Sequence, residues 1–348
     1  MTTQARPLTG LTLLEVGSSG PLALDLAIGF CGRIAADLGA HVIRVAERGG
    51  AAAQSTEAER IFLHSAKQNM SVAVLQRDEL VRELAATADA IVCDATTQIA
   101  LSSHGVKVPI ACIGMSIDSP AGGSEFTVEA RSGLLDLVGD PGRQPLRLAG
   151  HPLAYTAGTA IYLAMITAIL QKIAGEAPGA KRVDLLDIGV WLNWKTLGLA
   201  LRRGRIPTRA GSASEWFIVP CADGYVALVY RVQEWEALKQ ATGDPRLLGE
   251  EFSSVEQRRA HRTKLNVILS DIFSRMTRKD IRALSLKFKL PLGPVWTPAE
   301  LLADSHMVAR TFFHPVAVDD RNYLMPRLPV VWNGAAFPTV VKLRSASA

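Results

Sequence analysis

The turn that opens the chain's long apolar stretch holds side chains that could carry out chemistry. The stretch reads "AGHPLAYTAGTAIYLAMITAIL" over residues 149–170, and its first turn contains His151, Tyr155 and Thr156. A histidine can act as a general base, and a tyrosine can attack a carbonyl once a base activates it. A plain alternative places His151 in a loop before Pro152 and packs Tyr155 at a helix start. A reaction centre, a binding surface and a buried helix start therefore all stay open.

Two further features could bind an anion. The glycine/serine loop "GSSGP" (17–21) could present backbone N–H groups to a ligand, although an ordinary turn between a strand and a helix fits as well. Lys67 in "HSAKQNMSV" could bind a phosphate or lie on the solvated surface. The chain has neither GxGxxG nor GxxxxGK[ST], which excludes the standard dinucleotide and P-loop sites.

The possible metal-binding residues show no ligand spacing. The seven histidines are scattered, and the four cysteines lie far apart without a CxxC pair. We therefore expect no metal site and no disulfide framework, and we expect the cysteines to be small core residues.

Composition limits the class of protein. The 348 residues are 48% hydrophobic and 20% charged, which is enough to bury a sizeable core. The net charge of +5 suits a phosphorylated or carboxylate ligand, but the basic residues form no run interleaved with aromatics, so we expect no nucleic-acid partner. The N-terminus shows no apolar signal segment, and a cytoplasmic location is expected. Residues 153–170 approach membrane-spanning length, yet their tyrosine and threonines favour a buried helix over a membrane contact.

The elements that would position these residues alternate between strands and helices in the first half. Apolar runs predict strands over 11–16, 41–46, 70–75, 89–94 and 107–115, and helical spacing falls between several of them, as in 26–40 and 77–88. Such β-α-β alternation is typical of an α/β fold with a doubly wound parallel sheet. Helical stretches over 124–139, with Ser124 as N-cap, and over 152–174 follow, and a short strand then leads into another helix before residue 205.

The second half has a different pattern. Residues 205–216 read as a linker, and 216–230 predict a hairpin that turns at Asp223-Gly224. Amphipathic helices follow, one of them capped by Thr277 with Asp280 three residues later. A turn, a short strand and a Thr-Pro helix start occupy 291–304.

Seven segments stand in the order in which one known family has them. They are "PLTGLTLLEVG", "GRIAADLGAHVIRVAERGG", "AKQNMSVAV", "ADAIVCDA", "SEFTVEARSGLLDLVGDPGRQPLRL", "VPCADGYVAL" and "LPLGPVWTPAELLADSHMVARTFFHP". Together they resemble the class III CoA-transferase family, the CaiB/BaiF group, over most of residues 7–335. Each segment is weakly specific by itself, and the resemblance rests on their shared order.

The resemblance implies a large α/β CoA-binding domain (1–204), a smaller α+β domain (205–322) and a C-terminal return to the large domain (323–348). It also implies an intertwined dimer, in which each chain threads through its partner. Coenzyme A or an acyl-CoA would be the ligand, with no covalently bound cofactor. By matched position, Ser18, Ser19, Arg44 and Lys67 are the expected CoA contacts, whereas Asp94 replaces a family asparagine and is a poor neighbour for phosphates.

The family reaction depends on an aspartate that attacks the acyl-CoA carbonyl. That aspartate stands four residues before a glycine, which is Gly158 here, and the matching residue is Ala154. The racemases of the same family use a histidine and that aspartate, and the histidine maps to about Ser124. Tyr155 should point elsewhere, because one residue along a helix rotates the side chain by about 100°. Glu125 and Glu129 could reach the site, although Glu125 also suits the first turn of a helix.

Three functions remain. The preferred one is a non-catalytic subunit of a heteromeric CoA-transferase, which pairs with a paralogous chain that carries the aspartate and does not transfer CoA by itself. An enzyme that acts on acyl-CoA by a route without an aspartyl intermediate is the second. A CoA- or acyl-CoA-binding protein without catalysis is the third, and the sequence does not identify the acyl group or the acceptor acid.

Overall fold

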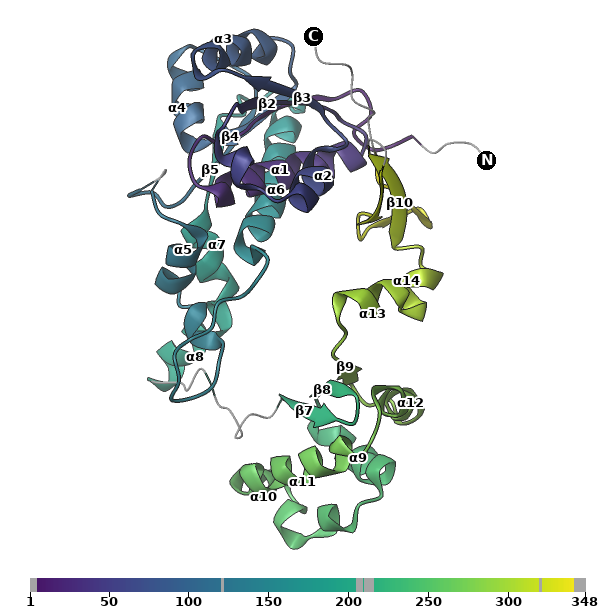
Figure 1. Ribbon diagram of the computed structural model, residues 1–348. Helices are drawn as coiled ribbons and strands as arrows, with labels where there is room; N and C mark the ends of the chain where they lie inside the picture. The colour runs from purple at the N-terminus through teal and green to yellow at the C-terminus, as the bar shows by residue number, and fades with distance from the viewer. Residues whose placement is uncertain (1–4, 120–121, 205–208, 210–215, 319–320, 341–348) are drawn as a thin grey trace. The chain divides into compact units, whose positions relative to one another are not determined.

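The structure is a computed structural model that describes residues 5–119, 122–204, 209, 216–318 and 321–340 (Figure 1). The chain forms two compact units, and each is described by itself. The first unit comprises residues 1–137, 146–206 and 306–348, and the second comprises 138–145 and 207–305.

A six-stranded sheet forms the centre of the first unit, and every neighbouring pair of its strands is parallel. The strand order is β3-β2-β1-β4-β5-β6. The predicted α/β fold with a doubly wound parallel sheet is thereby confirmed. The strands are β1 (Thr12–Val16), β2 (His41–Glu47), β3 (Gln68–Val72), β4 (Ala90–Asp94), β5 (Ile110–Gly114) and β6 (Ala180–Asp184).

Helices cover both faces of this sheet (Figure 1). Leu13 of β1 packs with α1 (Leu22–Asp37) and α6 (Pro152–Ile173), whereas Leu14 packs with α3 (Val74–Ala85) and α4 (Ala95–Ser103). Successive side chains of a strand point to opposite faces, so a strand covered on both sides is mostly apolar, and a buried charge such as Glu15 of β1 needs a partner inside the protein. Gly158 lets α6 approach α1 closely, because a Cβ atom there would lie 2.7 Å from the carbonyl oxygen of Ala27.

The remaining elements of the first unit lie outside the sheet. The helices α2 (Glu57–His64), α5 (Glu125–Arg131), α7 (Leu185–Leu192) and α8 (Trp194–Arg203) belong to it. The later part of the chain adds the antiparallel pair β10 (Phe313–Val318) and β11 (Arg321–Pro326) and the short pair β12 (Val331–Trp332) and β13 (Ala335–Ala336). It also adds α14 (Ser305–Ala309), whose first residue, Ser305, belongs to the second unit.

The second unit contains a three-stranded antiparallel sheet of β7 (Phe217–Cys221), β8 (Gly224–Leu228) and β9 (Leu292–Pro294). It shares a core with α9 (Trp235–Thr242), α11 (Arg262–Ser274) and α12 (Arg278–Phe288). The helices α10 (Val255–Ala260) and α13 (Pro298–Ala303) belong to the same unit. Capping boxes start α12 at Thr277 and α13 at Thr297, as the sequence predicts for Thr277.

Several local predictions differ from the structure. The strand predicted over 70–75 ends at Val72, and Val74 and Leu75 begin α3 with side chains 60% and 96% exposed. Apolar residues had suggested a strand there, but Val74 and Leu75 lie on the solvent side of a helix. The hairpin turns at Ala222-Asp223, because Gly224 already pairs with Cys221.

The β10–β11 pair falls in the first unit, and residues 138–145 group with the second unit. The expected domain boundaries at 204 and 322 stay predictions. Most of the linker-like segment, 205–208 and 210–215, lies outside the described residues.

Candidate functional site

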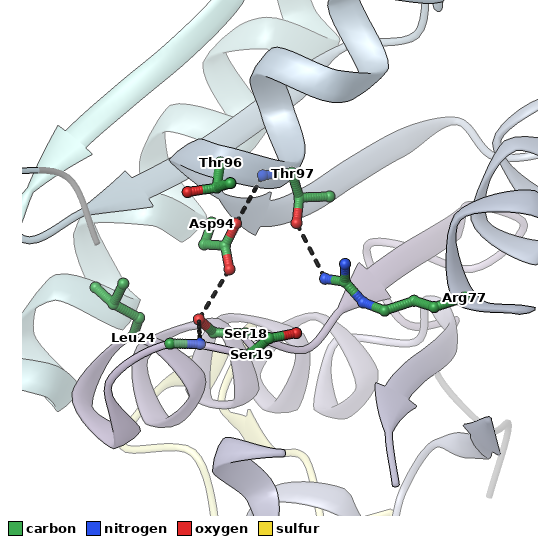
Figure 2. Close-up of a pocket in the computed structure, with 8 residues that line it drawn as sticks. Ser18, Ser19, Leu24, Arg77, Asp94, Thr96 and Thr97 are labelled. Carbon is green, nitrogen blue, oxygen red and sulfur yellow. Dashed lines mark hydrogen bonds between the residues drawn. The ribbon is translucent and has the colours of Figure 1, made fainter. Parts of the chain in front are cut away.

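A pocket of about 200 Å³ lies at the carboxyl ends of β1 and β4 (Figure 2). These neighbouring strands stand where the strand order of the sheet reverses, which is the usual ligand position in open α/β sheets. The helix α4 begins at this edge immediately after β4, and α1 begins there after the loop 17–21 that follows β1. The residues that line the pocket are Ser18, Ser19, Gly20, Leu24, Arg77, Asp94, Thr96 and Thr97.

The two predicted serines do line this pocket. The Ser18 hydroxyl donates to Asp94 Oδ2 at 2.8 Å and accepts the N–H of Gly20 at 3.1 Å. The Ser19 hydroxyl donates to Glu47 Oε2 at 2.6 Å. Asp94 also accepts the N–H of Thr97 at 2.8 Å and so caps α4. Because both Asp94 oxygens accept hydrogen bonds within the protein, this carboxylate has a structural reason to replace an asparagine.

Arg77 is the cationic residue of the pocket lining (Figure 2). One guanidinium nitrogen donates to the carbonyl oxygen of Gly17 at 3.1 Å and to Thr97 Oγ1 at 3.0 Å. Its Nε is buried and has no hydrogen-bond partner among the described residues. Arg77 carried no signal in the sequence, because it stands in an ordinary amphipathic helix and only the packing of α3 brings it to the pocket.

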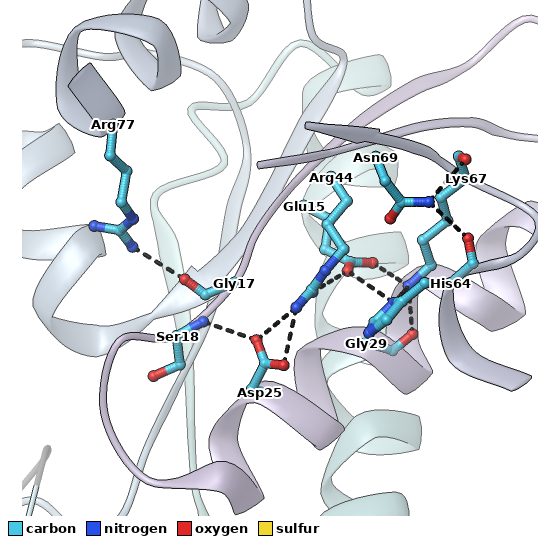
Figure 3. Close-up of polar contacts among 10 residues, drawn as sticks. All are labelled: Glu15, Gly17, Ser18, Asp25, Gly29, Arg44, His64, Lys67, Asn69 and Arg77. Carbon is cyan, nitrogen blue, oxygen red and sulfur yellow. Dashed lines mark hydrogen bonds and ion pairs between the residues drawn. The ribbon is translucent and has the colours of Figure 1, made fainter. Parts of the chain in front are cut away.

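The structure places the other two predicted contacts, Arg44 and Lys67, in a buried ion network (Figure 3). Arg44 pairs with Glu15 at 2.5 Å and with Asp25 at 2.8 Å. Lys67 Nζ donates to Glu15 Oε2 at 2.6 Å and to the carbonyl oxygen of Gly29 at 2.7 Å. Neither cation lines the pocket, and their donors are directed to groups inside the protein.

The network nevertheless reaches the pocket through one hydrogen bond. Asp25, held by Arg44, accepts the backbone N–H of Ser18 at 3.0 Å (Figure 3). The loop that carries Ser18 and Ser19 is thereby fixed from the interior. In this structure Arg44 supports the loop through Asp25, and Lys67 is joined to Arg44 through Glu15.

Burial and neighbouring charges shift the pKa values in this network. Burial lowers the pKa of Lys67 to about 8, although Glu15 raises it. Burial also lowers the pKa of His64 well below its usual range, and Arg44 and Lys67 lower it further, so His64 is neutral. Burial by itself would lower the pKa of Arg44, but the charges and hydrogen bonds of Asp25 and Glu15 outweigh burial and raise that pKa. Two carboxylates thus balance two cations.

A second polar cluster lies at the start of α6. Ala154 is fully buried in the first turn, and Glu125 Oε1 accepts the backbone N–H groups of Leu153 at 3.0 Å and of Ala154 at 3.1 Å. The other oxygen of Glu125 lies 2.5 Å from His151 Nδ1. Glu125 stands in the first turn of α5, as predicted, but its carboxylate caps α6. The sequence placed Glu125 at a helix start and His151 before Pro152 without linking them, and the structure brings them together.

Tyr155 matches the packing alternative. Its ring meets Phe30 edge-on with the ring centroids 5.2 Å apart. Burial raises the pKa of its hydroxyl to about 12, with smaller contributions from Glu59 and Glu125. A phenol that holds its proton this tightly is a poor nucleophile.

Glu129 lies beside the same cluster. Its side chain is 1% exposed, and neither oxygen has a hydrogen-bond partner among the described residues. Arg147 Nε lies 4.0 Å from Oε2, which is beyond hydrogen-bond distance. Burial, and secondarily Glu125, raise the pKa of Glu129, while Arg147 and His151 act in the opposite direction.

The described residues contain no group of three or more histidine, cysteine, aspartate or glutamate residues that could hold a metal ion. They contain one helix, α6, that is long and apolar enough to cross a membrane, and 39% of its most apolar window is buried in the protein.

Comparisons with known proteins agree with this geometry. The sequence model of CoA-transferase family III matches residues 116–342, more than half of the chain. Succinate–glutarate CoA-transferase of Agrobacterium fabrum is 27% identical over 343 residues, which cover 87% of this chain and 84% of that protein. The alpha subunit of succinyl-CoA–L-malate CoA-transferase of Chloroflexus aurantiacus is 25% identical over 350 residues, covering 88% of this chain and 78% of the subunit.

A solved structure shows the same fold. The crystal structure of a CAIB/BAIF family protein from Brucella suis matches with a TM-score of 0.81 and 21% identity, covering 98% of this chain and 97% of that one. The parallel sheet, the family match and the related CoA-transferases confirm the family predicted from the seven segments. The chain belongs to CoA-transferase family III.

Proposed function

We propose that this chain binds a CoA thioester and serves as a non-catalytic subunit of a heteromeric CoA-transferase. The observation that carries the proposal is Ala154 in the first turn of α6, where the family resemblance expects the aspartate nucleophile. A methyl group has no lone pair with which to attack an acyl carbon or to hold CoA as a thioester. The attacking carboxylate would come from a partner chain.

The pocket at β1 and β4 supports the CoA-binding part of the proposal. Coenzyme A carries phosphate groups, and the N-terminal ends of α1 and α4 favour negative charge at this edge of the sheet. Arg77 adds a cation, and Ser18 and Ser19 line the pocket beside it. We assign direct contact to these residues, and we assign Arg44 and Lys67 to the support of the loop.

Exposed apolar side chains support assembly with another chain. Trp191 on α7 and Trp194 and Leu201 on α8 are 70%, 68% and 90% exposed. Large apolar groups gathered on neighbouring helices are typical of protein interfaces. The partner is a paralogous family member in our proposal, with an intertwined dimer as its architecture. The Chloroflexus relative, whose name describes it as an alpha subunit, is an example of a subunit in this family.

The test is to purify the chain at native abundance from its own cells and to identify what accompanies it. We expect a homologue that carries aspartate at the position of Ala154, and CoA transfer from succinyl-CoA to carboxylic acids only when both chains are present. A homodimer that transfers CoA by itself would contradict the proposal. The A154D variant is a useful companion, since gained transfer would show that the rest of the site is intact.

An acyl-CoA enzyme with a non-aspartyl mechanism is the second candidate. The observation that favours it is the short contact between Glu125 and His151 beside Ala154. It predicts that the purified chain consumes an acyl-CoA without a partner.

A further inference from the structure

A histidine and a carboxylate form a defined pair at the start of α6. His151 Nδ1 lies 2.5 Å from Glu125 Oε2, and the two residues stand on different elements, 26 positions apart. The other oxygen of Glu125 is fixed by the N–H groups of Leu153 and Ala154. The carboxylate therefore cannot rotate away without giving up three hydrogen bonds at once.

This arrangement selects one tautomer of the imidazole ring. An ionised carboxylate accepts hydrogen bonds only, so Nδ1 must carry the proton that it donates to Glu125. In the neutral ring the lone pair is then on Nε2, which is the state that a general base requires. The His151 side chain is 26% exposed, so the ring is open to solvent on part of its surface.

The backbone of His151 has a conformation that is uncommon for residues other than glycine. Its φ angle is +56°, in the left-handed region that residues other than glycine adopt uncommonly. Residues held in such conformations often occur at functional sites, where the surrounding structure maintains the strain. A glycine or an asparagine would satisfy the backbone more easily, and neither would supply a base.

A second buried carboxylate stands next to the pair. Glu129 is 1% exposed and has no hydrogen-bond partner among the described residues, and its nearest cation is the half-exposed Arg147 at 4.0 Å. Nearby negative charge stabilises an imidazolium ion that forms during proton transfer. The cluster thus contains a base, a residue that orients it and a second acidic group beside it.

We propose that His151, oriented by Glu125, is a general base that hydrolyses CoA thioesters in this chain. His151 Nε2 takes a proton from a water molecule while the water oxygen forms a bond to the thioester carbonyl carbon. The carbon–sulfur bond then breaks, and the imidazolium returns the proton to the thiolate. The products are free coenzyme A and a carboxylic acid, and the reaction uses no residue at position 154.

This inference rests on the proposed binding of a CoA thioester, and it is separate from the subunit role, in which the chain is non-catalytic for CoA transfer only. The hydrolysis is measured with the full chain alone, whereas the subunit role is measured as CoA transfer with a partner. Failure of one measurement therefore leaves the other unaffected.

The experiment follows release of free thiol from acetyl-CoA and succinyl-CoA by the purified chain. H151N keeps a residue that tolerates the left-handed backbone, and we expect it to lose about 10²-fold or more of the rate. H104Q is the matched control, because His104 is an exposed histidine bonded through Nδ1 to its own helix, and its rate should equal that of the wild type.

Two more variants separate catalysis from structure. E125Q can still accept the N–H groups of α6, but its amide donates to Nδ1 and imposes the wrong tautomer, so we expect a loss between about 10-fold and 10⁴-fold at an unchanged melting temperature. H151G leaves space for a free imidazole, and added imidazole should restore part of the rate. Rescue of this kind would not follow if His151 only held the loop.

Specific results overturn the proposal. Thiol release by the wild type no faster than in buffer would do so, as would an unchanged rate in H151N. A rate in H151G that imidazole does not raise would show that the histidine acts on structure alone.

Discussion

Removal of Lys67 tests whether the buried ion network stabilises the first unit. In the K67M variant, Glu15 and the carbonyl oxygen of Gly29 each lose a buried donor. Removing one partner of a buried ion pair typically costs about 3–5 kcal/mol, because the other charge is left uncompensated. Glu15 still pairs with Arg44, so we expect a cost near the lower limit, about 3 kcal/mol.

A second substitution distinguishes charge from packing. K67M leaves two carboxylates, Glu15 and Asp25, with the single cation Arg44, whereas E15Q/K67M restores the charge balance. We therefore expect the double variant to be more stable than K67M by at least about 1 kcal/mol. R131M is the control for an exposed pair in the same unit, at 3.5 Å from Asp118, and should change stability by about 1 kcal/mol at most.

The assay is urea unfolding followed by circular dichroism, with the two units allowed separate transitions. Its pH dependence gives an independent check. The pKa of Lys67 is lowered from 10.5 to about 8, so between these pH values the unfolded chain binds more protons and this lysine makes stability rise with pH. The difference in free energy of unfolding between the wild type and K67M should therefore increase as the pH rises through this window. A K67M cost below about 1 kcal/mol, or a double variant less stable than K67M, would refute the reasoning.

Three other predictions concern single substitutions. E129Q should raise stability at neutral pH by about 1 kcal/mol, because burial raises the pKa of Glu129 and makes its ionisation unfavourable in the folded state. This gain should disappear on acidification toward pH 4.5, and urea unfolding at both pH values measures it. R77M should weaken CoA binding by about 10-fold and reduce its salt dependence, as measured by calorimetry, because it removes the pocket's cation. G158A should lower the free energy of unfolding by about 1–3 kcal/mol, since its Cβ would meet the carbonyl oxygen of Ala27. In the control G198A in α8, the added Cβ meets nothing within 4 Å, so thermal unfolding should show no change or a stabilisation of up to about 1 kcal/mol.

The fold was predictable from sequence where burial leaves a simple pattern. β1, β4 and β5 are short apolar runs because helices cover both of their faces, and the Thr277 capping box marks a helix start by side-chain chemistry alone. The strand predicted over 70–75 extended too far because Val74 and Leu75 are apolar residues exposed on a helix. A run of apolar letters does not show whether a neighbour covers it.

The site was only partly predictable. Ser18 and Ser19 could be found, because a glycine/serine loop directly after a buried strand must lie at the carboxyl edge of the sheet. The burial of Lys67 could not be found, since its partner Glu15 is 52 residues away and only the packing of the sheet joins them. The Glu125–His151 contact could not be predicted for the same reason, because α5 and the start of α6 meet only in the folded chain.

The hydrogen bond from Ser18 to Asp25 has a consequence for ligand affinity. A loop that must become ordered when a ligand arrives loses conformational entropy, and that loss weakens binding. Here Asp25 and Arg44 hold the loop before any ligand is present. The interior of the sheet domain therefore contributes to affinity through preorganisation, and a substitution in the network can weaken a ligand that none of its side chains contacts.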